Sequence, residues 1–266
     1  MADITARDVQ ALRRLTGAGI LDARRALVET DNDQEKAARW LREQGLAGAS
    51  KRADRARAEG AVSVVVTDGG RRGAVLALEC ETDFVAKSAD FVRLVDTLAE
   101  AFATGGEEAL AAFEAEVDQL KVTLKENIAL GRHERFEAAP DSVLDSYLHV
   151  QSGRGVNGVL VELAGGSAAL AHDIAVHIAF ARPEYLRRED VPAEVVAQER
   201  ETIAAAARNE GRPEAQLDKV VEGRLNGWFK DRVLLDQPYA RDDKQSIAQV
   251  LGSAEVRRFA QVVVGG

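Results

Sequence analysis

Cysteine is almost absent from this sequence, which has one, Cys80, in 266 residues. A single cysteine excludes a disulfide within the chain and suits a reducing compartment. No apolar run reaches the roughly 18 residues of a membrane-spanning helix, and the N-terminal stretch "MADITARDVQ" is too polar for the apolar region of a secretory signal. We therefore expect a cytoplasmic protein with no membrane partner.

Positive charge and aromatic residues are also scarce. Lysine and arginine number 35 against 44 acidic residues, which gives a net charge of −9, and aromatics make up 5% of the chain. Since nucleic-acid-binding proteins normally carry a basic face, this balance argues against a direct nucleic-acid partner and favours a protein partner. One basic cluster, Lys51 to Arg57, lacks interleaved aromatics, and we interpret it as a solvated linker rather than a nucleic-acid site.

The length predicts several modules, because domains usually contain roughly 100 to 200 residues. Residues 1–50 read as three short helices: Thr5 is a candidate N-cap, and "TGAG" (residues 16–19) supplies glycines for a helix stop and a tight turn. "TDND" (residues 30–33) ends the second helix and caps the third. A triplet of this size with a glycine loop resembles the ubiquitin-associated (UBA) fold, which binds proteins.

A repeated pattern predicts a core of two similar halves, at residues 51–140 and 141–192. In each half a strand with β-forming residues precedes an amphipathic helix: "AVLALE" precedes "FVRLVDTLAEAFA", and "GVLVELAGG" precedes "LAHDIAVHIAFA". We expect each half to be an antiparallel sheet covered on one face by helices. A further long helix is expected over residues 107–130. The fold class is therefore α+β.

Residues 193–232 interrupt this pattern with two amphipathic helices joined by "EGRP". The second carries an apolar stripe that includes Leu217, Val221 and Leu225. Such a pair should pack antiparallel as a projecting helical hairpin, a short coiled coil. Residues 233–266 then return to the second half of the core through the strand-like "AEVRRFAQVVV".

Most candidate catalytic or ligand-binding patterns do not survive inspection. "GRGVNG" (residues 153–158) has the glycine spacing of dinucleotide-binding loops, but that mechanism needs a helix to start at the glycines, and here a strand follows. We interpret it as a hairpin turn. The four histidines lack ligand partners at metal-site spacing, so no metal and no cofactor are expected. Cys80 lies in an apolar strand, where a packing role is favoured over a nucleophile.

One stretch resists a packing explanation. "ETDFVAK" (residues 81–87) places an acid beside a phenylalanine at a turn between a strand and a helix. Phe84 is either a core residue that starts the helix, with Asp83 as its N-cap, or an exposed ring that another protein receives. The residues alone leave these two alternatives open.

The chain resembles bacterial elongation factor Ts over nearly its whole length. The resemblance is carried by "LRRLTGAGILDARRAL" near the N-terminus and by "ETDFVAK", followed in order by "SYLH", "RPEYL", "VEGR" and "QPYA". Members of that family promote release of GDP from elongation factor Tu, the GTPase that delivers aminoacyl-tRNA to the ribosome. The resemblance implies a guanine nucleotide exchange factor that makes or breaks no covalent bond.

The resemblance also implies roles for particular residues. Thr82, Asp83, Phe84 and Val85 match the segment that intrudes near the partner's nucleotide site and helps to dislodge Mg²⁺; Phe84 is the expected wedge and Asp83 the polar disturbance. The residues that match partner-binding positions are Arg13, Ile20, Leu21, Lys51 and His149. Burial within the three helices is the alternative for Ile20 and Leu21, and a plain sheet position is the alternative for His149.

Two other functions remain open at this point. One is a non-catalytic adaptor that tethers proteins through the UBA-like module, and the other is a thiol enzyme built on Cys80. Longer family members continue after the last core strand with a further helical module that packs on the partner. Since this chain stops at "VVVGG", we expect no such C-terminal module here.

Overall fold

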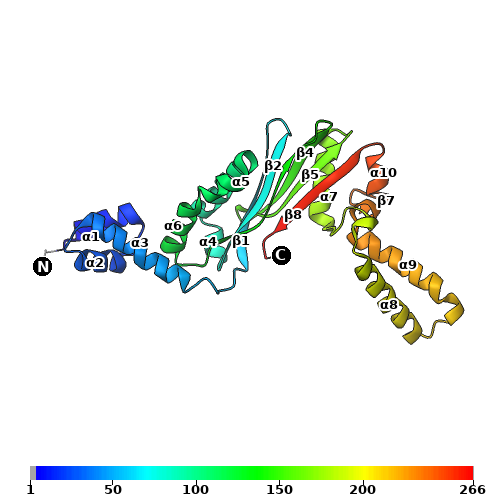
Figure 1. Cartoon of the computed structure of the whole chain (residues 1–266), viewed down its shortest axis with the longest axis horizontal. Coiled ribbons are helices and arrows are strands. Elements are labelled where there is room, and N and C mark those ends of the chain that lie inside the picture. The colour runs from blue at the N-terminus through cyan, green and yellow to red at the C-terminus, as the bar shows by residue number, and fades with distance from the viewer. Residues whose placement is uncertain (1–3, 266) are drawn as a thin grey trace.

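The computed structural model describes residues 4–265, with every side chain except those of residues 46, 47 and 50. The chain is elongated (Figure 1): three helices form one end, two sheets with their helices form the middle, and a helix pair projects at the other end. The described part combines ten α-helices with antiparallel sheets, which agrees with the predicted mixture of helices and antiparallel strands. Residues 1–3 and 266, which the predicted modules include at their ends, lie outside the described residues.

The N-terminal helices form around their own small core. Thr5 caps the first one: its hydroxyl accepts from the amide of Asp8, whose carboxylate accepts from the amide of Thr5. That helix ends at Gly17, whose φ of 69° is a left-handed conformation that glycine adopts without strain. The cap and the glycine stop are both as predicted. The helices are α1 (Ala6–Thr16), α2 (Ile20–Glu29) and α3 (Gln34–Ser50).

Two three-stranded antiparallel sheets form the centre of the molecule. The first has the order β1-β2-β3 and the second the order β4-β5-β8, so the C-terminal strand completes the second sheet. The strands are β1 (Glu59–Thr67), β2 (Arg72–Cys80), β3 (Ala129–Glu137), β4 (Ser142–Gln151), β5 (Arg154–Ala164) and β8 (Glu255–Val263).

Each sheet has a helix on one face and the other sheet on its opposite face. Helix α5 (Ala89–Ala111) packs on β1 and β2, and α7 (Ala168–Ala181) packs on β4 and β5. The layers are therefore helix, sheet, sheet, helix (Figure 1). A buried apolar cluster fills the space between the two sheets: Val62, Val75, Ala77, Phe136, Leu144, Leu160, Ala260 and Val262.

Close contact between the sheets explains the glycines of "GRGVNG". Only Gly153 belongs to the hairpin turn, whereas Gly155 and Gly158 lie inside β5. A Cβ atom at Gly155 would lie 2.1 Å from the backbone oxygen of Val62, and one at Gly158 would lie 2.7 Å from Val62 Cγ1. The interpretation of the whole motif as a turn is thus corrected, because two of its glycines let β1 approach β5.

The helix expected over residues 107–130 is also wrong in part. Helix α5 ends at Ala111, α6 covers Glu114–Leu124, and Ala129 already belongs to β3. Lys125 ends α6 in a left-handed conformation, with φ of 59°, and Ile128 is fully buried. Good helix formers continue past Leu124, but burial of Ile128 and pairing of β3 with β2 override their propensity.

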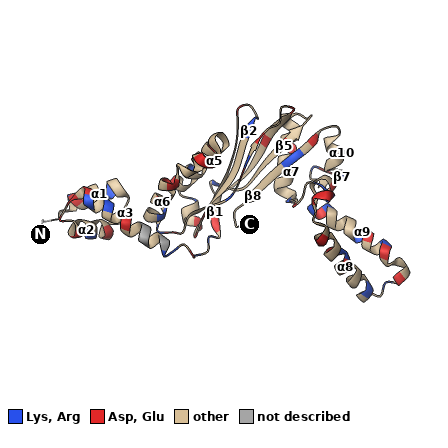
Figure 2. Ribbon diagram, viewed as in Figure 1, with Lys and Arg blue, Asp and Glu red and all other residues tan. Residues whose placement is uncertain are grey.

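The helix pair at the other end consists of α8 (Ala193–Asn209) and α9 (Glu214–Arg232), which pack on each other. Leu217, Val221 and Leu225 are buried between them, as the apolar stripe predicted. Acidic and basic residues are both present along the helix pair (Figure 2), and some form ion pairs between the two helices, for example Arg200 with Glu222. Short elements complete the chain: α4 (Asp83–Ala86), η1 (Arg188–Asp190), η2 (Leu234–Asp236), β6 (Pro238–Tyr239), β7 (Asp242–Ser246) and α10 (Ile247–Leu251).

The glycine contact between the sheets gives a stability prediction. Gly155→Ala places a methyl group against the backbone of β1, and overpacking of this kind usually costs about 1–3 kcal/mol. Urea unfolding followed by far-UV circular dichroism should show a lower midpoint. Gly223→Ala is the matched control, because Gly223 lies in α9 with open space around it, and alanine there should raise stability slightly. An unchanged midpoint for Gly155→Ala would contradict the close approach.

Candidate functional site

Phe84 stands almost fully exposed at one end of the core. It lies in the one-turn helix α4, which directly follows β2, and 83% of its surface is exposed. Val85 is half-buried against the first core cluster and Ala86 is fully buried, so the turn is anchored on its other side. The alternative of Phe84 as a core residue is therefore wrong. The turn therefore presents an exposed aromatic ring on an anchored backbone, a feature that marks interaction sites when it stands on a protein surface.

A buried carboxylate holds the backbone in front of Phe84. Glu126, which is 9% exposed, accepts hydrogen bonds from the amides of Glu81 (3.0 Å) and Thr82 (3.2 Å) and from the hydroxyl of Thr82. The Thr82 hydroxyl in turn accepts from the amide of Val85 and so caps α4. The N-cap is thus Thr82 and not Asp83, which corrects the alternative given above. The side chains of Glu126 and Thr82 therefore fix the conformation of the turn.

Hydrogen bonds of Glu81 and Asn127 hold the same segment before Phe84 in place. The carboxylate of Glu81 accepts from the amide of Asn127 at 2.6 Å, and the Asn127 side chain donates to the carbonyls of Ala53 (2.9 Å) and Arg55 (2.7 Å). Sequence reasoning missed Glu126 and Asn127, because it placed both in a helix. The signal that could have found them is "EN" next to Lys125, a polar pair at a helix end followed by an apolar strand.

Asp83 faces solvent beside Phe84 and forms an ion pair with Lys87, one helical turn later, at 2.5 Å. The hydrogen bond from Lys87 lowers the pKa of Asp83, with smaller contributions from the charges of Lys87 and Arg154. Asp83 therefore carries its negative charge at neutral pH. The site presents an apolar ring and a carboxylate as adjacent groups.

Cys80 lies beneath this turn and is fully buried. Its thiol donates to the carbonyl of Thr82 at 3.3 Å. Burial raises the pKa of Cys80 to about 12, and the nearby charge of Glu126 acts in the same direction. The thiolate is the nucleophilic form of cysteine, so a thiol in this state does not support an enzyme built on Cys80.

His149 lies at the same end of the core as Phe84. Arg154, at the start of β5, donates to the carbonyl of Gly60 (2.6 Å) and pairs with Glu59 (2.7 Å), which lies opposite Cys80 in the first sheet. These bonds bring the hairpin between β4 and β5 next to the strand end that leads into α4. His149 is exposed on β4, and its neighbour Val150 is 57% exposed.

The N-terminal helices carry a second exposed apolar surface. Ile20 and Leu21, in the first turn of α2, are 58% and 81% exposed, so the alternative of burial among the three helices is wrong. Arg13 is exposed on α1, and its Nε donates to the carbonyl of Ala18 at 3.1 Å, which holds its side chain along the turn before α2. Lys51 is exposed directly after α3 and belongs to neither surface.

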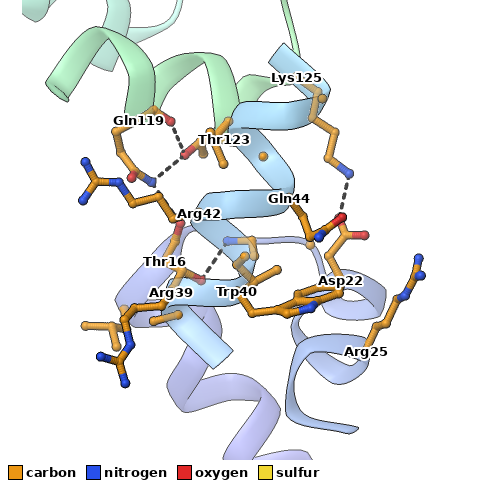
Figure 3. A pocket seen from close by; sticks show the side chains of 18 of the residues that line it. Thr16, Asp22, Arg25, Arg39, Trp40, Arg42, Gln44, Gln119, Thr123 and Lys125 are labelled. Carbon is orange, nitrogen blue, oxygen red and sulfur yellow. Dashed lines mark hydrogen bonds and ion pairs between the residues drawn. The ribbon is translucent and has the colours of Figure 1, made fainter. Parts of the chain in front are cut away.

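A groove of about 640 Å³ lies between the N-terminal helices and α6, and α3 forms one of its walls (Figure 3). Two bonds cross it: Lys125 Nζ pairs with Asp22 at 2.6 Å, and the Gln119 side chain donates to the carbonyl of Thr16 at 3.3 Å. Asp22 follows Leu21 directly, and Lys125 directly precedes Glu126. Lys125 and Glu126, which are adjacent in the sequence, therefore connect the exposed residues of α2 to the Phe84 turn.

Among residues 4–265 the structure brings together no cluster of three or more side chains able to hold a metal ion. Three histidines have other partners: His133 contacts Glu107, His172 contacts Asp145, and buried His177 contacts Gln237. Over the same residues, no helix has both the length and the apolar character needed to span a membrane.

Comparison with known proteins shows the family to which the chain belongs. The family model described as "Elongation factor TS" matches residues 81–266. The chain is 46% identical over 282 residues to an elongation factor Ts of Renibacterium salmoninarum, 44% identical over 280 residues to one of Streptomyces avermitilis, and 45% identical over 280 residues to one of Clavibacter michiganensis subsp. michiganensis. Each alignment covers 100% of both chains. The chain belongs to the elongation factor Ts family.

The buried thiol gives a prediction that needs no partner. With a pKa of about 12, the thiolate fraction of Cys80 at pH 8 is about one in ten thousand, against roughly one in ten for an unperturbed thiol. Labelling by a disulfide reagent should therefore be at least about 100-fold slower in buffer than in denaturing urea. Comparable rates in the two conditions would mean that Cys80 is accessible and ionised, contrary to its burial.

Proposed function

We propose that this chain is a translation elongation factor that acts as a guanine nucleotide exchange factor and promotes release of GDP from elongation factor Tu. Family membership supports the partner and the activity. The observation that carries the mechanism is the 83% exposure of Phe84 on a turn held by Glu126. An exposed phenylalanine on a fixed turn fits a pocket that belongs to another protein.

Exchange requires no chemical step by this chain. A factor that binds the empty GTPase more tightly than the nucleotide-loaded one must, by thermodynamic reciprocity, weaken nucleotide binding by the same factor. Each tenfold difference corresponds to about 1.4 kcal/mol. Burial of one phenylalanine side chain contributes about 1.5–3 kcal/mol, which is one to two such factors. We infer that the protein is not an enzyme in the sense of covalent catalysis.

Within this mechanism, Phe84 is the wedge that enters the partner near its nucleotide site, and Asp83 disturbs the ligands of the bound Mg²⁺. The ion needs near-octahedral oxygen ligands at about 2.0–2.1 Å, so a small displacement of these ligands weakens the binding of Mg²⁺. The lowered pKa of Asp83 keeps its carboxylate charged for this role. Thr82 and Val85 complete the segment as its cap and its anchor.

The remaining predicted residues extend the contact. Arg13, Ile20 and Leu21 form a clip on the N-terminal helices, and His149 contacts the partner from the same end of the core as Phe84. Their exposure supports these roles. We also assign Lys51 to the contact, on the basis of the family resemblance and its exposure.

We propose the modular division that the sequence suggested. Residues 1–50 are a UBA-like domain, 51–140 and 141–192 are the two halves of the core, 193–232 are an inserted coiled-coil hairpin, and 233–266 return to the second half. The separate apolar clusters of the N-terminal helices and of the α8–α9 pair support it. A cytoplasmic location follows from the proposed role in translation.

Phe84→Ala tests the wedge directly. Release of a fluorescent GDP analogue from elongation factor Tu, measured by stopped flow at saturating factor, should slow by about 10-fold or more, because the burial of the ring is lost. Phe84→Leu is the matched control, because it keeps an apolar side chain on the same anchored turn. Release should slow much less in that variant than in Phe84→Ala.

The same assay separates the proposal from its competitors. Binding of the wild-type chain without acceleration of release would favour the adaptor and contradict an exchange factor. Equal affinity for the empty and the GDP-loaded partner would exclude the mechanism on thermodynamic grounds. Loss of activity in Cys80→Ala, with folding intact, would point back to the thiol.

The clip on α2 has its own test. Leu21→Ser removes exposed apolar surface and should weaken binding to nucleotide-free elongation factor Tu by about 10-fold, measured by isothermal titration calorimetry. Val28→Ser is the control, since Val28 is 52% exposed on the same helix but lies two turns further on. If Val28→Ser weakens binding as much as Leu21→Ser, the contact is not centred on the start of α2.

A further inference from the structure

Three consecutive residues at the end of α6 contact three different parts of the chain. Lys125 pairs with Asp22 of α2, Glu126 binds the backbone at Thr82, and Asn127 binds the segment between α3 and β1. We propose that Lys125, Glu126 and Asn127 are positioning residues, which set the N-terminal helices at a fixed place relative to the Phe84 turn. This proposal rests on the proposed function and identifies what aligns its two contact surfaces.

Lys125 has a backbone conformation that is unusual for a lysine, and its side chain forms an ion pair that a glycine could not form. Its φ of 59° lies in the left-handed region, where glycine or asparagine is usual at a helix end and a lysine is disfavoured. A glycine would end α6 equally well. What lysine adds is the 2.6 Å ion pair with Asp22, drawn in Figure 3, which reaches across the groove to the helix that carries Ile20 and Leu21.

Other contacts hold α6 against the N-terminal helices. A Cβ at Gly45 of α3 would lie 2.3 Å from Val122 Cγ1, so α3 and α6 touch at this point because Gly45 lacks a side chain. The guanidinium of Arg52 donates to the carbonyl of Lys121 at 3.2 Å. The first of these contacts is apolar and the second is polar, and neither involves α2, so the ion pair between Lys125 and Asp22 is a separate link to the N-terminal helices.

Asn127 fixes the connecting segment in the same way. It is 7% exposed, and its side-chain amide donates to two carbonyls of that segment, those of Ala53 and Arg55. Arg55 also pairs with Glu81 at 3.3 Å, and Glu81 accepts from the amide of Asn127. The segment is therefore tied to the backbone that precedes Phe84.

The consequence concerns binding. Two contact surfaces on one chain bind cooperatively only when their separation fits the partner, and a fixed separation avoids the entropy cost of ordering them on contact. Lys125 and Asn127 act on the N-terminal helices, whereas Glu126 acts on the Phe84 turn. Loss of Lys125 should therefore change affinity, and loss of Glu126 should change the maximal release rate.

The first experiment measures the arrangement without the partner. Spin labels on Arg39→Cys in α3 and Glu100→Cys in α5, both exposed positions, report the separation by double electron–electron resonance, and buried Cys80 stays unlabelled. We expect one narrow distance distribution in the otherwise unchanged protein. Lys125→Asp places two carboxylates next to each other, and their repulsion should broaden this distance distribution. Since aspartate tolerates the left-handed conformation, α6 should still end at the same residue.

The exchanged pair is the decisive control. Asp22→Lys combined with Lys125→Asp restores opposite charges and should narrow the distribution again. Lys125→Gly, which removes the ion pair and keeps the favoured helix end, should broaden it less than Lys125→Asp. A narrow distribution in Lys125→Asp, or no recovery in the exchanged pair, would overturn the proposal.

The second experiment uses the GDP-release assay to separate the role of Lys125 from that of Glu126. Lys125→Asp should raise the factor concentration at half-maximal release about threefold or more, since an exposed ion pair is worth up to about fivefold and repulsion adds to its loss. The maximal rate should stay unchanged, and the exchanged pair should recover the wild-type concentration. Glu126→Gln should lower the maximal rate instead.

These outcomes are distinguishable from failure of the proposed function. If the wild-type chain does not accelerate release, the exchange activity is wrong, while the distance measurements still decide whether Lys125 positions the N-terminal helices. If release is normal and Lys125→Asp leaves the half-maximal concentration unchanged, the positioning role is wrong and the exchange activity stands.

Discussion

The arrangement of the candidate site depends on one buried carboxylate. Glu126 accepts three hydrogen bonds from the backbone and side chain that precede Phe84. Bonds to an ionised acceptor are roughly twice as strong as those between neutral groups, and each buried donor left without a partner costs about 1–3 kcal/mol. A ring on a turn held in this way is ordered before any partner arrives. Less conformational freedom is then lost when the ring is buried.

The rest of the fold supports this turn from below. The first sheet ends at Cys80 directly under it, and the second sheet is joined to the first through Arg154, Glu59 and the close backbone contact at Gly155. Helices α5 and α7 shield the outer faces, so the two sheets form a stiff centre between the N-terminal helices and the α8–α9 pair (Figure 1). The exposed ring is thus carried by the packed core that the two sheets form.

Local sequence patterns predicted most of the helices and strands, since Thr5, Gly17 and the apolar stripe of α9 have conformations that neighbouring residues dictate. They failed at residues 125–130, where the helix formers of α6 continue but burial of Ile128 and pairing with β2 decide the outcome. Long-range burial of this kind leaves no periodic signature. Glu126 and Asn127 were missed for the same reason.

The candidate site, too, could be predicted from the sequence only in part. The residues of "ETDFVAK" could not by themselves tell an exposed phenylalanine from a core one, because either fits a turn between a strand and a helix. The family resemblance favoured exposure, and the anchoring of Ala86 and Val85 gives the physical reason. How the N-terminal helices lie against α6 was beyond the sequence, since the contacts that join them, such as Lys125 with Asp22 and Gln119 with Thr16, link residues about one hundred positions apart.

The environment of Cys80 bears on how the protein meets oxidative stress. Peroxides attack the thiolate of cysteine, and here the only sulfhydryl of the chain is withheld both from solvent and from ionisation. Sulfenic acid and mixed disulfides with glutathione therefore have no ready starting point. Peroxide levels that oxidise exposed, ionised cysteines should therefore leave Cys80 in its thiol form.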